Sequence, residues 1–398
     1  MKQIITCFSE KTPLKYIQHY LQRCILERIP ARFRKWPLEE TWLQPTDYIY
    51  NSCRSAIYQY LYNLNKAHSH FTTKPLVLIP SLHCRSQVEA ALAASYTTSF
   101  YRVNRDLTVN EEDILRYIQE HSGLVVLSLV HYYGFPPAGL NIQHLRKYTN
   151  HTLFILEDGA HGLFSPIGHM GDASVYSLRK SLSVHGGVLR LRQDHLPIGL
   201  QPTPSPWLFA ARLLPIIKAI LKATPLYTIR SWVKNRLTQR LIARNTTNNQ
   251  PNKYVEPIFT AAHANAPAPP ITHIIISQLS NHTHVREYRQ RNFTYLAKHL
   301  SNRPDIQPLF SSYHKEFKMG VSPLAFPIIT SKRNRLERRL ADEGIITFAF
   351  GRDPHESFNV HDVPETQWLV DHTLALPCHQ DLSQTDLQRI VTAVIRSI

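Results

Sequence analysis

The chain has 398 residues, and 45 Lys and Arg against 29 Asp and Glu give it a formal net charge of +16. Because 43% of its residues are hydrophobic and 10% are aromatic, it can bury a large core, which excludes disorder as its main state. The length favours one large and one smaller domain. A basic excess of this size either serves a partner such as a phosphate, a nucleic acid or an anionic membrane, or is a basic surface without one. Charge alone therefore leaves the function open.

The cysteines are odd in number, widely scattered and without a C-x-x-C pair, at Cys7, Cys24, Cys53, Cys84 and Cys378. This pattern indicates neither a disulfide framework nor a zinc site, so a reducing cytosol is the simplest compartment. The amino end meets charge at Glu10 and Lys11 before an apolar core forms, which argues against a secretory signal. No run of about twenty apolar residues predicts a membrane-spanning helix. We expect a cytoplasmic protein.

The first half of the chain alternates short apolar strands with helices. Residues 1–45 are predicted to form an N-terminal arm and residues 46–200 a large domain, in which a helix over 56–64 begins just after the polar run 52–55. Strands are predicted at 76–79, 99–103, 124–130, 153–156, 174–177 and 188–191, with helices at 86–94, 111–120 and 142–148. Continuous apolar strands separated by helices are typical of a mostly parallel α/β sheet that is covered on both faces.

The second half opens with a basic helical insert and linker over residues 201–270. Residues 195–255 contain no Asp or Glu and nine Lys and Arg, so more than half of the net charge is local. The apolar face of residues 207–253, flanked by cations, fits either an interfacial helix on an anionic membrane or a helical excursion that packs on its own subunit or a dimer mate. Nucleic acid is not expected, because no binding fold is evident. Residues 271–398 are predicted to form a helix, over 274–300, and a small α+β C-terminal domain.

Three groups in the large domain suggest a common chemistry. Asp158 ends a buried strand, where the carboxyl edge of a parallel sheet faces a ligand, although it could instead cap a helix. Ser177 and Lys180 leave the next strand three residues apart, which suits a phosphate contact and a Schiff-base lysine. The helix that begins after Ser52 offers its N-terminus to an anion. Together they predict a pyridoxal phosphate site, with the phosphate on the helix and Ser177, the aldehyde on Lys180 and the pyridine nitrogen on an ionised Asp158.

Six ordered motifs between residues 51 and 379 resemble the DegT/StrS family of pyridoxal-phosphate-dependent, fold type I sugar aminotransferases. They are NSCRSA at 51–56, IPSLHC at 79–84, VHYYG at 130–134, EDGAHG at 157–162, GHMGDASVYS at 168–177 and LALPCH at 374–379. The resemblance implies a large domain with a mostly parallel, seven-stranded sheet, a small α+β C-terminal domain and a homodimer. It does not cover the basic insert.

The resemblance also assigns roles to single residues. Lys180 would be the Schiff-base lysine and proton-transferring base, and Asp158 the partner of the pyridine nitrogen. His161 would lie beside the ring oxygen of the cofactor. The phosphate would be held by Ser177 and by the backbone of Cys53 and Arg54, next to Ser52. The implied reaction is a ping-pong transfer of an amino group from an amino-acid donor to a keto sugar that is linked to a nucleotide.

Departures from the family pattern keep other hypotheses open. Cys84 occupies the position where family members carry an aromatic residue that stacks on the cofactor, with His83 as the substitute nearby. The short interval from Ser177 to Lys180 and the lack of the family's Asn-containing phosphate loop favour, as alternatives, a catalytically inactive binding or regulatory protein, or another pyridoxal-phosphate-dependent reaction on sugars. His131 and His379 are weaker candidates for substrate contact. The histidines lack metal-ligand spacing, so no metal is expected.

Overall fold

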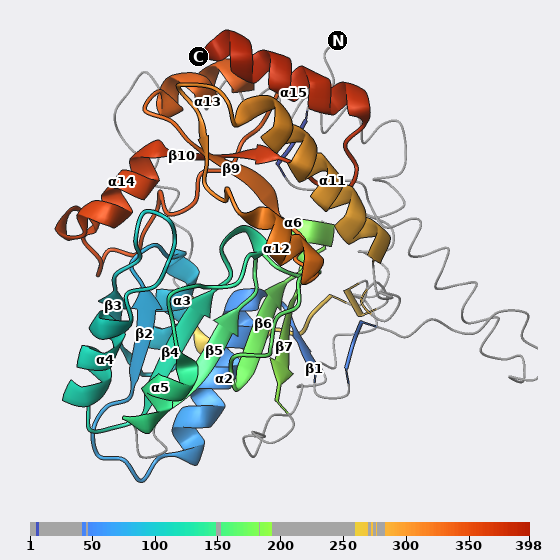
Figure 1. The fold of residues 1–398 in the computed structure, drawn as a ribbon. Coiled ribbons are helices and arrows are strands. Elements are labelled where there is room, and N and C mark those ends of the chain that lie inside the picture. Colours follow the sequence, from blue (N-terminus) through green and yellow to red (C-terminus); the bar gives the residue numbers. More distant parts are fainter. Residues whose placement is uncertain are drawn as a thin grey trace, which may run out of the picture.

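The computed structural model describes residues 5–7, 42–44, 47–148, 153–182, 184–192, 259–269, 272–273, 276 and 283–398. Seven strands form one sheet in the order β1-β7-β6-β5-β4-β2-β3 (Figure 1). They are β1 (Asp47–Tyr50), β2 (Leu76–Pro80), β3 (Thr97–Tyr101), β4 (Val125–Val130), β5 (Leu153–Asp158), β6 (Ala173–Ser177) and β7 (Gly187–Leu191). Strands β3, β2, β4, β5 and β6 run parallel, whereas β7 and β1 are antiparallel to their neighbours. The predicted mostly parallel, seven-stranded sheet is confirmed.

Helices cover both faces of this sheet, which explains why its strands are apolar on both sides. On one face, α2 (Cys53–Ala67) and α3 (Arg85–Ala93) pack on side chains such as Val77 and Val126. On the other face, α4 (Glu111–Glu120) and α5 (Ile142–Lys147) pack on side chains such as Leu78 and Leu127. A 3-10 turn, η2 (Tyr132–Gly134), follows β4, and α6 (Arg179–Leu182) follows β6.

The C-terminal part builds a second, antiparallel sheet in the order β10-β9-β8, packed against helices (Figure 1). Its strands are β8 (Gln307–Pro308), β9 (Ala325–Ile329) and β10 (Thr373–Pro377). Its helices are α11 (Thr283–Leu300), α12 (Tyr313–Lys318), α13 (Arg333–Asp342), α14 (Pro364–His372) and α15 (Gln384–Ser397), with a 3-10 turn, η4 (Val360–Asp362). Buried side chains of this small domain, among them Phe326 and Leu374, share one core with Val130 and Tyr132 of the large domain. The two sheets therefore meet directly above β4.

Two short segments near the amino end pair with later parts of the chain, one inside the predicted arm and one just after it. Ile5 bridges to Ile345 in parallel, and its N–H donates to the carbonyl of Gly344 at 2.9 Å. The segment Asp47–Tyr50 is an edge strand, β1, paired with β7, where the Asp47 carboxylate binds Arg190 at 2.7 Å. Pattern analysis misses β1 because four residues that include an aspartate show no strand periodicity of their own.

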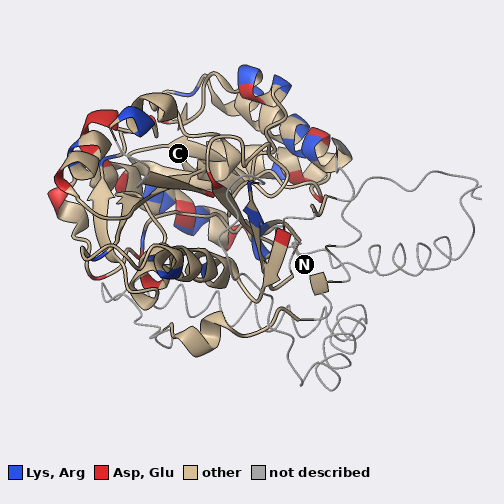
Figure 2. Cartoon of the chain, turned by 90° about the horizontal axis from the view of Figure 1, so that it is seen from below, with Lys and Arg blue, Asp and Glu red and all other residues tan. Residues whose placement is uncertain are grey.

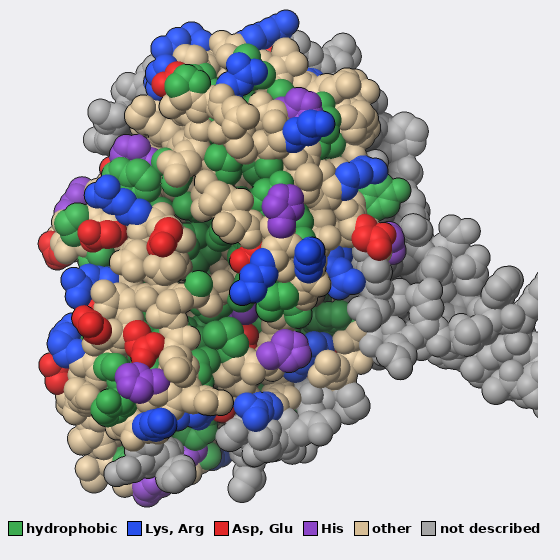
Figure 3. All heavy atoms as spheres, in the orientation of Figure 1, with side chains coloured by type: hydrophobic (Ala, Val, Ile, Leu, Met, Phe, Trp, Pro, Cys, Tyr) green, Lys and Arg blue, Asp and Glu red, His purple; other side chains and the backbone are tan. Residues whose placement is uncertain are grey.

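Charges of both signs are interspersed over the described elements, both along the ribbon (Figure 2) and on the face drawn in Figure 3. The acid-free stretch 195–255, including the segment 207–253 with its proposed membrane face, lies outside the described residues, as does part of the predicted helix 274–300. A short helix, α9 (Ala261–Ala264), packs on α2 beyond this stretch. Within the described residues, no helix combines the length and the apolar character needed to cross a membrane.

Candidate active site

The predicted site residues gather at one edge of the large sheet. Strands β2, β4, β5 and β6 are parallel, so their carboxyl ends lie on the same side. Asp158 is the last residue of β5, and Ser177 is the last residue of β6. Lys180 lies on α6, directly after β6. The sequence prediction that the carboxyl edge brings these three residues together is consistent with this topology.

Asp158 is buried and faces two fixed donors. The backbone N–H of Ala160 donates to its Oδ1 at 2.9 Å, and the side-chain amide of Gln87 donates to its Oδ2. The side chain is 6% exposed, so these donors replace water around the carboxylate. Residues 159–162 form a turn, so Asp158 does not cap a helix. Of the two interpretations of Asp158 given above, a helix cap and a carboxylate that faces a ligand, the second stays a prediction.

Lys180 is half-buried, and none of the described residues forms a hydrogen bond or ion pair with its amine. Its Nζ lies 5.7 Å from the ring centroid of Phe348 and 5.9 Å from that of Phe350. Burial lowers the pKa of the Lys180 amine below its ordinary value, although Cys84, Asp158 and Cys53 act electrostatically in the opposite direction. A larger share of the amine is therefore neutral, and so nucleophilic, than in an exposed lysine.

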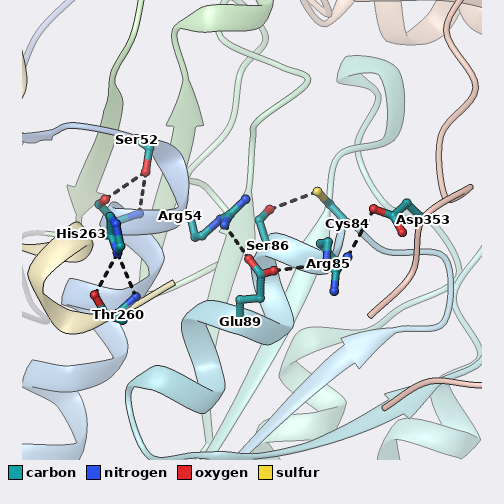
Figure 4. A network of polar contacts seen from close by, with 10 residues as sticks. Ser52, Arg54, Cys84, Arg85, Ser86, Glu89, Thr260, His263 and Asp353 are labelled. Carbon is teal, nitrogen blue, oxygen red and sulfur yellow. Dashed lines mark hydrogen bonds and ion pairs between the residues drawn. The ribbon is translucent and has the colours of Figure 1, made fainter. Parts of the chain in front are cut away.

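The first turn of α2 supplies the predicted anion site. Ser52 caps the helix, because its Oγ accepts the N–H of Ser55 at 3.1 Å. The remaining amides of a helix's first turn have no acceptor within the helix, so they are able to bind an anion. The guanidinium of Arg54 pairs with Glu89 at 2.6 Å (Figure 4), so its side chain is already engaged. The prediction that Cys53 and Arg54 act through their backbone agrees with this arrangement.

Gly187, the first residue of β7, allows the start of α2 to approach the sheet. A Cβ on this residue would overlap backbone atoms of Ser52 and Cys53, which cannot rotate away as a flexible side chain can. We expect Gly187→Ala to destabilise the fold by about 1–3 kcal/mol, the usual effect of overpacking, and to weaken phosphate binding at α2. Thermal unfolding and titration with inorganic phosphate measure the two effects. An alanine variant that matches the parent protein in both would disprove the close approach.

His161 lies beside Lys180 in an aromatic environment. Its Nδ1 accepts the backbone N–H of Tyr133 at 3.2 Å, and its ring meets those of Phe350 and Phe348 at 4.9 and 5.8 Å. Burial, and then the charge of Lys180, hold the pKa of His161 well below its ordinary value. The imidazole is therefore neutral, with the proton on Nε2, and it offers a donor to a cofactor or substrate oxygen.

The two residues considered for the stacking position have other partners. Cys84 caps α3 and its Sγ accepts the hydroxyl of Ser86 at 3.0 Å (Figure 4). His83 is buried, and its ring stacks on Phe100 with a centroid distance of 4.9 Å and meets Phe358 edge-on at 5.1 Å. Burial lowers the pKa of His83 to about 4. The described contacts of His83 do not include Lys180 or Asp158, so its stacking role stays a prediction.

Phe348 and Phe350, which sequence reasoning missed, supply aromatic rings at the site from the small domain. Phe348 pairs with Ala375 of β10 through hydrogen bonds in both directions, at 3.0 and 2.8 Å. The small sheet thereby holds both rings against Lys180 and His161. In the sequence these residues appear only as the run Phe348-Ala349-Phe350-Gly351, and nothing in that run indicates that it pairs with Ala375. We call Phe348 and Phe350 the aromatic wall.

The two histidines predicted to contact substrate, His131 and His379, form hydrogen bonds with other residues of the protein. The Nε2 of His131 lies 2.8 Å from the Oε2 of Glu157. Burial raises the pKa of Glu157, but His131 and the backbone amides of Gly171 and Gly168 outweigh that effect and keep it below its ordinary value. His379 lies with Nε2 3.1 Å from the carbonyl of Thr6, and its Nδ1 accepts the N–H of Asp381 at 3.2 Å. Their substrate roles stay predictions.

The described residues also show what lies outside the candidate active site. The described residues contain no group of three or more His, Cys, Asp and Glu side chains arranged to hold a metal ion. A surface cleft of about 700 Å³ is lined by Leu140, Asn141, Ile142, Gln143, Arg146, His169, Met170 and Arg192. None of the predicted site residues lines it.

Comparison with known proteins bears on the family resemblance and on the fold. Residues 272–395 match the model of the DegT/DnrJ/EryC1/StrS aminotransferase family. No curated protein matches the chain by sequence. The family match confirms the resemblance predicted from the ordered motifs, although it covers the small domain and α11 rather than Lys180.

Solved structures share the fold over nearly the whole chain. PseC of Helicobacter pylori, an aminotransferase of pseudoaminic acid biosynthesis, is 15% identical, with a TM-score of 0.64 and 99% of each chain covered. A candidate sugar aminotransferase of Streptococcus pneumoniae, Spr1654, solved in its PLP form, is 13% identical, with a TM-score of 0.63 and 100% of each chain covered. DesI, solved with its TDP-sugar product, is 15% identical, with a TM-score of 0.59, over 99% of this chain and 92% of DesI. At these identities the likeness establishes the fold.

Proposed function

We propose that the chain is a transaminase that uses pyridoxal phosphate and aminates a keto sugar linked to a nucleotide, with an amino acid as donor. The match of residues 272–395 to the DegT/DnrJ/EryC1/StrS aminotransferase family model supports this proposal. The observation that supports the proposal most directly is the half-buried amine of Lys180, which has no hydrogen-bond or ion-pair partner among the described residues and interacts electrostatically with the buried Asp158. The sugar class is supported by the printed descriptions of PseC and DesI.

The residues at the carboxyl edge fit pyridoxal phosphate in charge and chemistry. Asp158 is an acceptor held by two donors, which suits a protonated ring nitrogen. The amides at the start of α2, with the hydroxyl of Ser177, suit a phosphate. Lys180 presents an amine whose lowered pKa suits attachment to an aldehyde. When bound, the cofactor supplies an electron sink for the carbon that loses a proton.

The protein's own groups would transfer the proton, donate a hydrogen bond and exclude water. The neutral amine of Lys180 accepts a proton from the amino donor and returns it at a different atom of the reacting system, which is general base and general acid catalysis. The neutral His161 donates a hydrogen bond without adding a charge. The aromatic wall keeps water from the Lys180 amine and strengthens the electrostatic contacts below it.

The proposal is tested by adding pyridoxal phosphate to the purified protein and recording its visible absorbance. A panel of amino acids, including glutamate, is then supplied one at a time without acceptor. We expect a band from the bound cofactor that converts to the amine form with at least one donor, and recovery of the first band when a keto nucleotide-sugar follows. A cofactor band that no donor changes would favour the inactive binding protein. Absence of any band would contradict the proposal.

The assembly and location inferred from the sequence also stay proposals. We propose a homodimer, which light scattering would report as twice the chain mass of 46.0 kDa. The contact of residues 207–253 with an anionic membrane, and a cytoplasmic location, rest on composition alone.

A further inference from the structure

Gln87 lies at the base of the candidate site and belongs to none of the roles assigned so far. It occupies the first turn of α3, where its N–H donates to the carbonyl of Cys84 at 3.0 Å. Its side chain is 4% exposed and its Nε2 donates to the Oδ2 of Asp158. The Oε1 of Gln87 is buried and has no hydrogen-bond partner among the described residues. The described hydrogen bonds of this side chain are therefore directed at Asp158 alone.

The chemistry of the two groups fixes which end of the amide faces the carboxylate. An ionised carboxylate only accepts hydrogen bonds, so the NH₂ end of Gln87 must point toward it. The hydrogen bonds from Gln87 and Ala160 each reach a different oxygen of Asp158, so both oxygens act as acceptors and the carboxylate is held in one orientation. In this orientation the buried Oε1 of Gln87 has no hydrogen-bond partner among the described residues, which is energetically unfavourable.

We propose that Gln87 is a positioning residue that holds the Asp158 carboxylate in one orientation, so that it can hold a proton on the pyridine nitrogen of the cofactor. This inference rests on the proposed function, because it gives Gln87 a role through Asp158. Three titratable groups also face Asp158: Cys53 on α2, Tyr132 on η2 and Lys180 on α6. All three are present in the parent protein and in any Gln87 variant, so a comparison of the two isolates the amide.

The test compares Gln87→Met, which keeps the length of the side chain but cannot donate, with the parent protein. Gln290→Met is the matched control, because Gln290 also uses its Nε2 as a donor, to the backbone carbonyls of Phe317 and Val321 in the small domain. With cofactor bound, we expect Gln87→Met to slow the reaction with the amino donor about tenfold, the size expected for one hydrogen bond to a charged group. The pH midpoint of the visible absorbance should shift toward that of Asp158→Asn. Gln290→Met should change neither.

A second readout needs no cofactor and so remains valid if the proposed function fails. Without ligand, Gln87→Met should lower the free energy of unfolding, because the buried carboxylate of Asp158 loses one of its two donors. In the Asp158→Asn background the same substitution should have a smaller effect, because the partner is no longer charged. A loss of equal size in both backgrounds, together with a parent-like absorbance titration, would overturn the proposal.

Discussion

Replacing Lys180 with alanine is expected to reduce the reaction with the amino donor by at least about 10³-fold, since it removes both the nucleophile and the proton-transferring base. The visible band of the bound cofactor should change as well, because no other amine would be attached to it. The groups that act on this amine electrostatically are Cys84, Asp158, Cys53 and Arg179, and none of them is a second primary amine. Single-turnover absorbance with a saturating amino acid measures the loss.

Two further variants make the result specific to the amine of Lys180. Lys180→Arg keeps a cation but cannot become neutral, so it should be as inactive as alanine. Lys332→Ala removes a lysine that pairs with Asp305 at 3.0 Å in the small domain, and it should leave the donor reaction unchanged. Small primary amines added to Lys180→Ala should restore part of the rate. A Lys180→Ala protein that retains the parent rate would rule out Lys180 and direct attention to the lysines outside the described residues, such as Lys218 and Lys222.

Asp158→Asn should have the second largest effect, about 10²–10³-fold on the donor reaction, as is usual when a preorganised charge is removed from a reacting centre. Asparagine preserves the shape of the side chain but cannot stabilise a proton on the ring nitrogen by charge. The phosphate contacts at α2 do not involve Asp158, so cofactor binding should weaken less than the rate. Rates and cofactor titrations on the same variant separate the two.

The control for Asp158→Asn is Asp305→Asn in the small domain. Its carboxylate pairs with Lys332 across a partly exposed surface, so the variant should behave as the parent protein. Asp158→Asn should also unfold at nearly the parent temperature, since its oxygen can still accept from Ala160 and the Gln87 amide can turn so that its Oε1 accepts from the new NH₂ group. If the donor reaction survives in Asp158→Asn within a factor of about two, the carboxylate does not serve the ring nitrogen.

The large sheet could be predicted because each of its central strands is an uninterrupted apolar run. The helix predicted over 111–120 coincides with α4, whose first turn is marked by Asn110 and three acidic residues. By contrast, β1 could not be predicted, because its strand character comes from pairing with β7. A local sequence pattern predicts a helix or strand only when the apolar residues of that segment recur with the spacing of a helix or a strand.

For the candidate site, too, local patterns in the sequence predict only some of the residues. Asp158, Ser177 and Lys180 could be predicted because each follows a recognisable strand, and parallel strands share their carboxyl edge. Gln87 could not, since its contact with Asp158 spans 71 residues and depends on the rotation of α3. The aromatic wall was also out of reach, because it is brought to Lys180 by the pairing of Phe348 with Ala375.

The parallel bridge between Ile5 and Ile345 has a practical meaning for work on this chain. The N–H of Ile346 donates to the carbonyl of Ile5 at 2.7 Å, two residues before the first ring of the aromatic wall. Thr6, in turn, accepts from His379 just after β10. An affinity tag, fluorophore or immobilisation linker at the amino end would therefore be attached close to the cover of the reacting amine. A carboxyl-terminal attachment, beyond α15, is the safer choice for kinetic measurements.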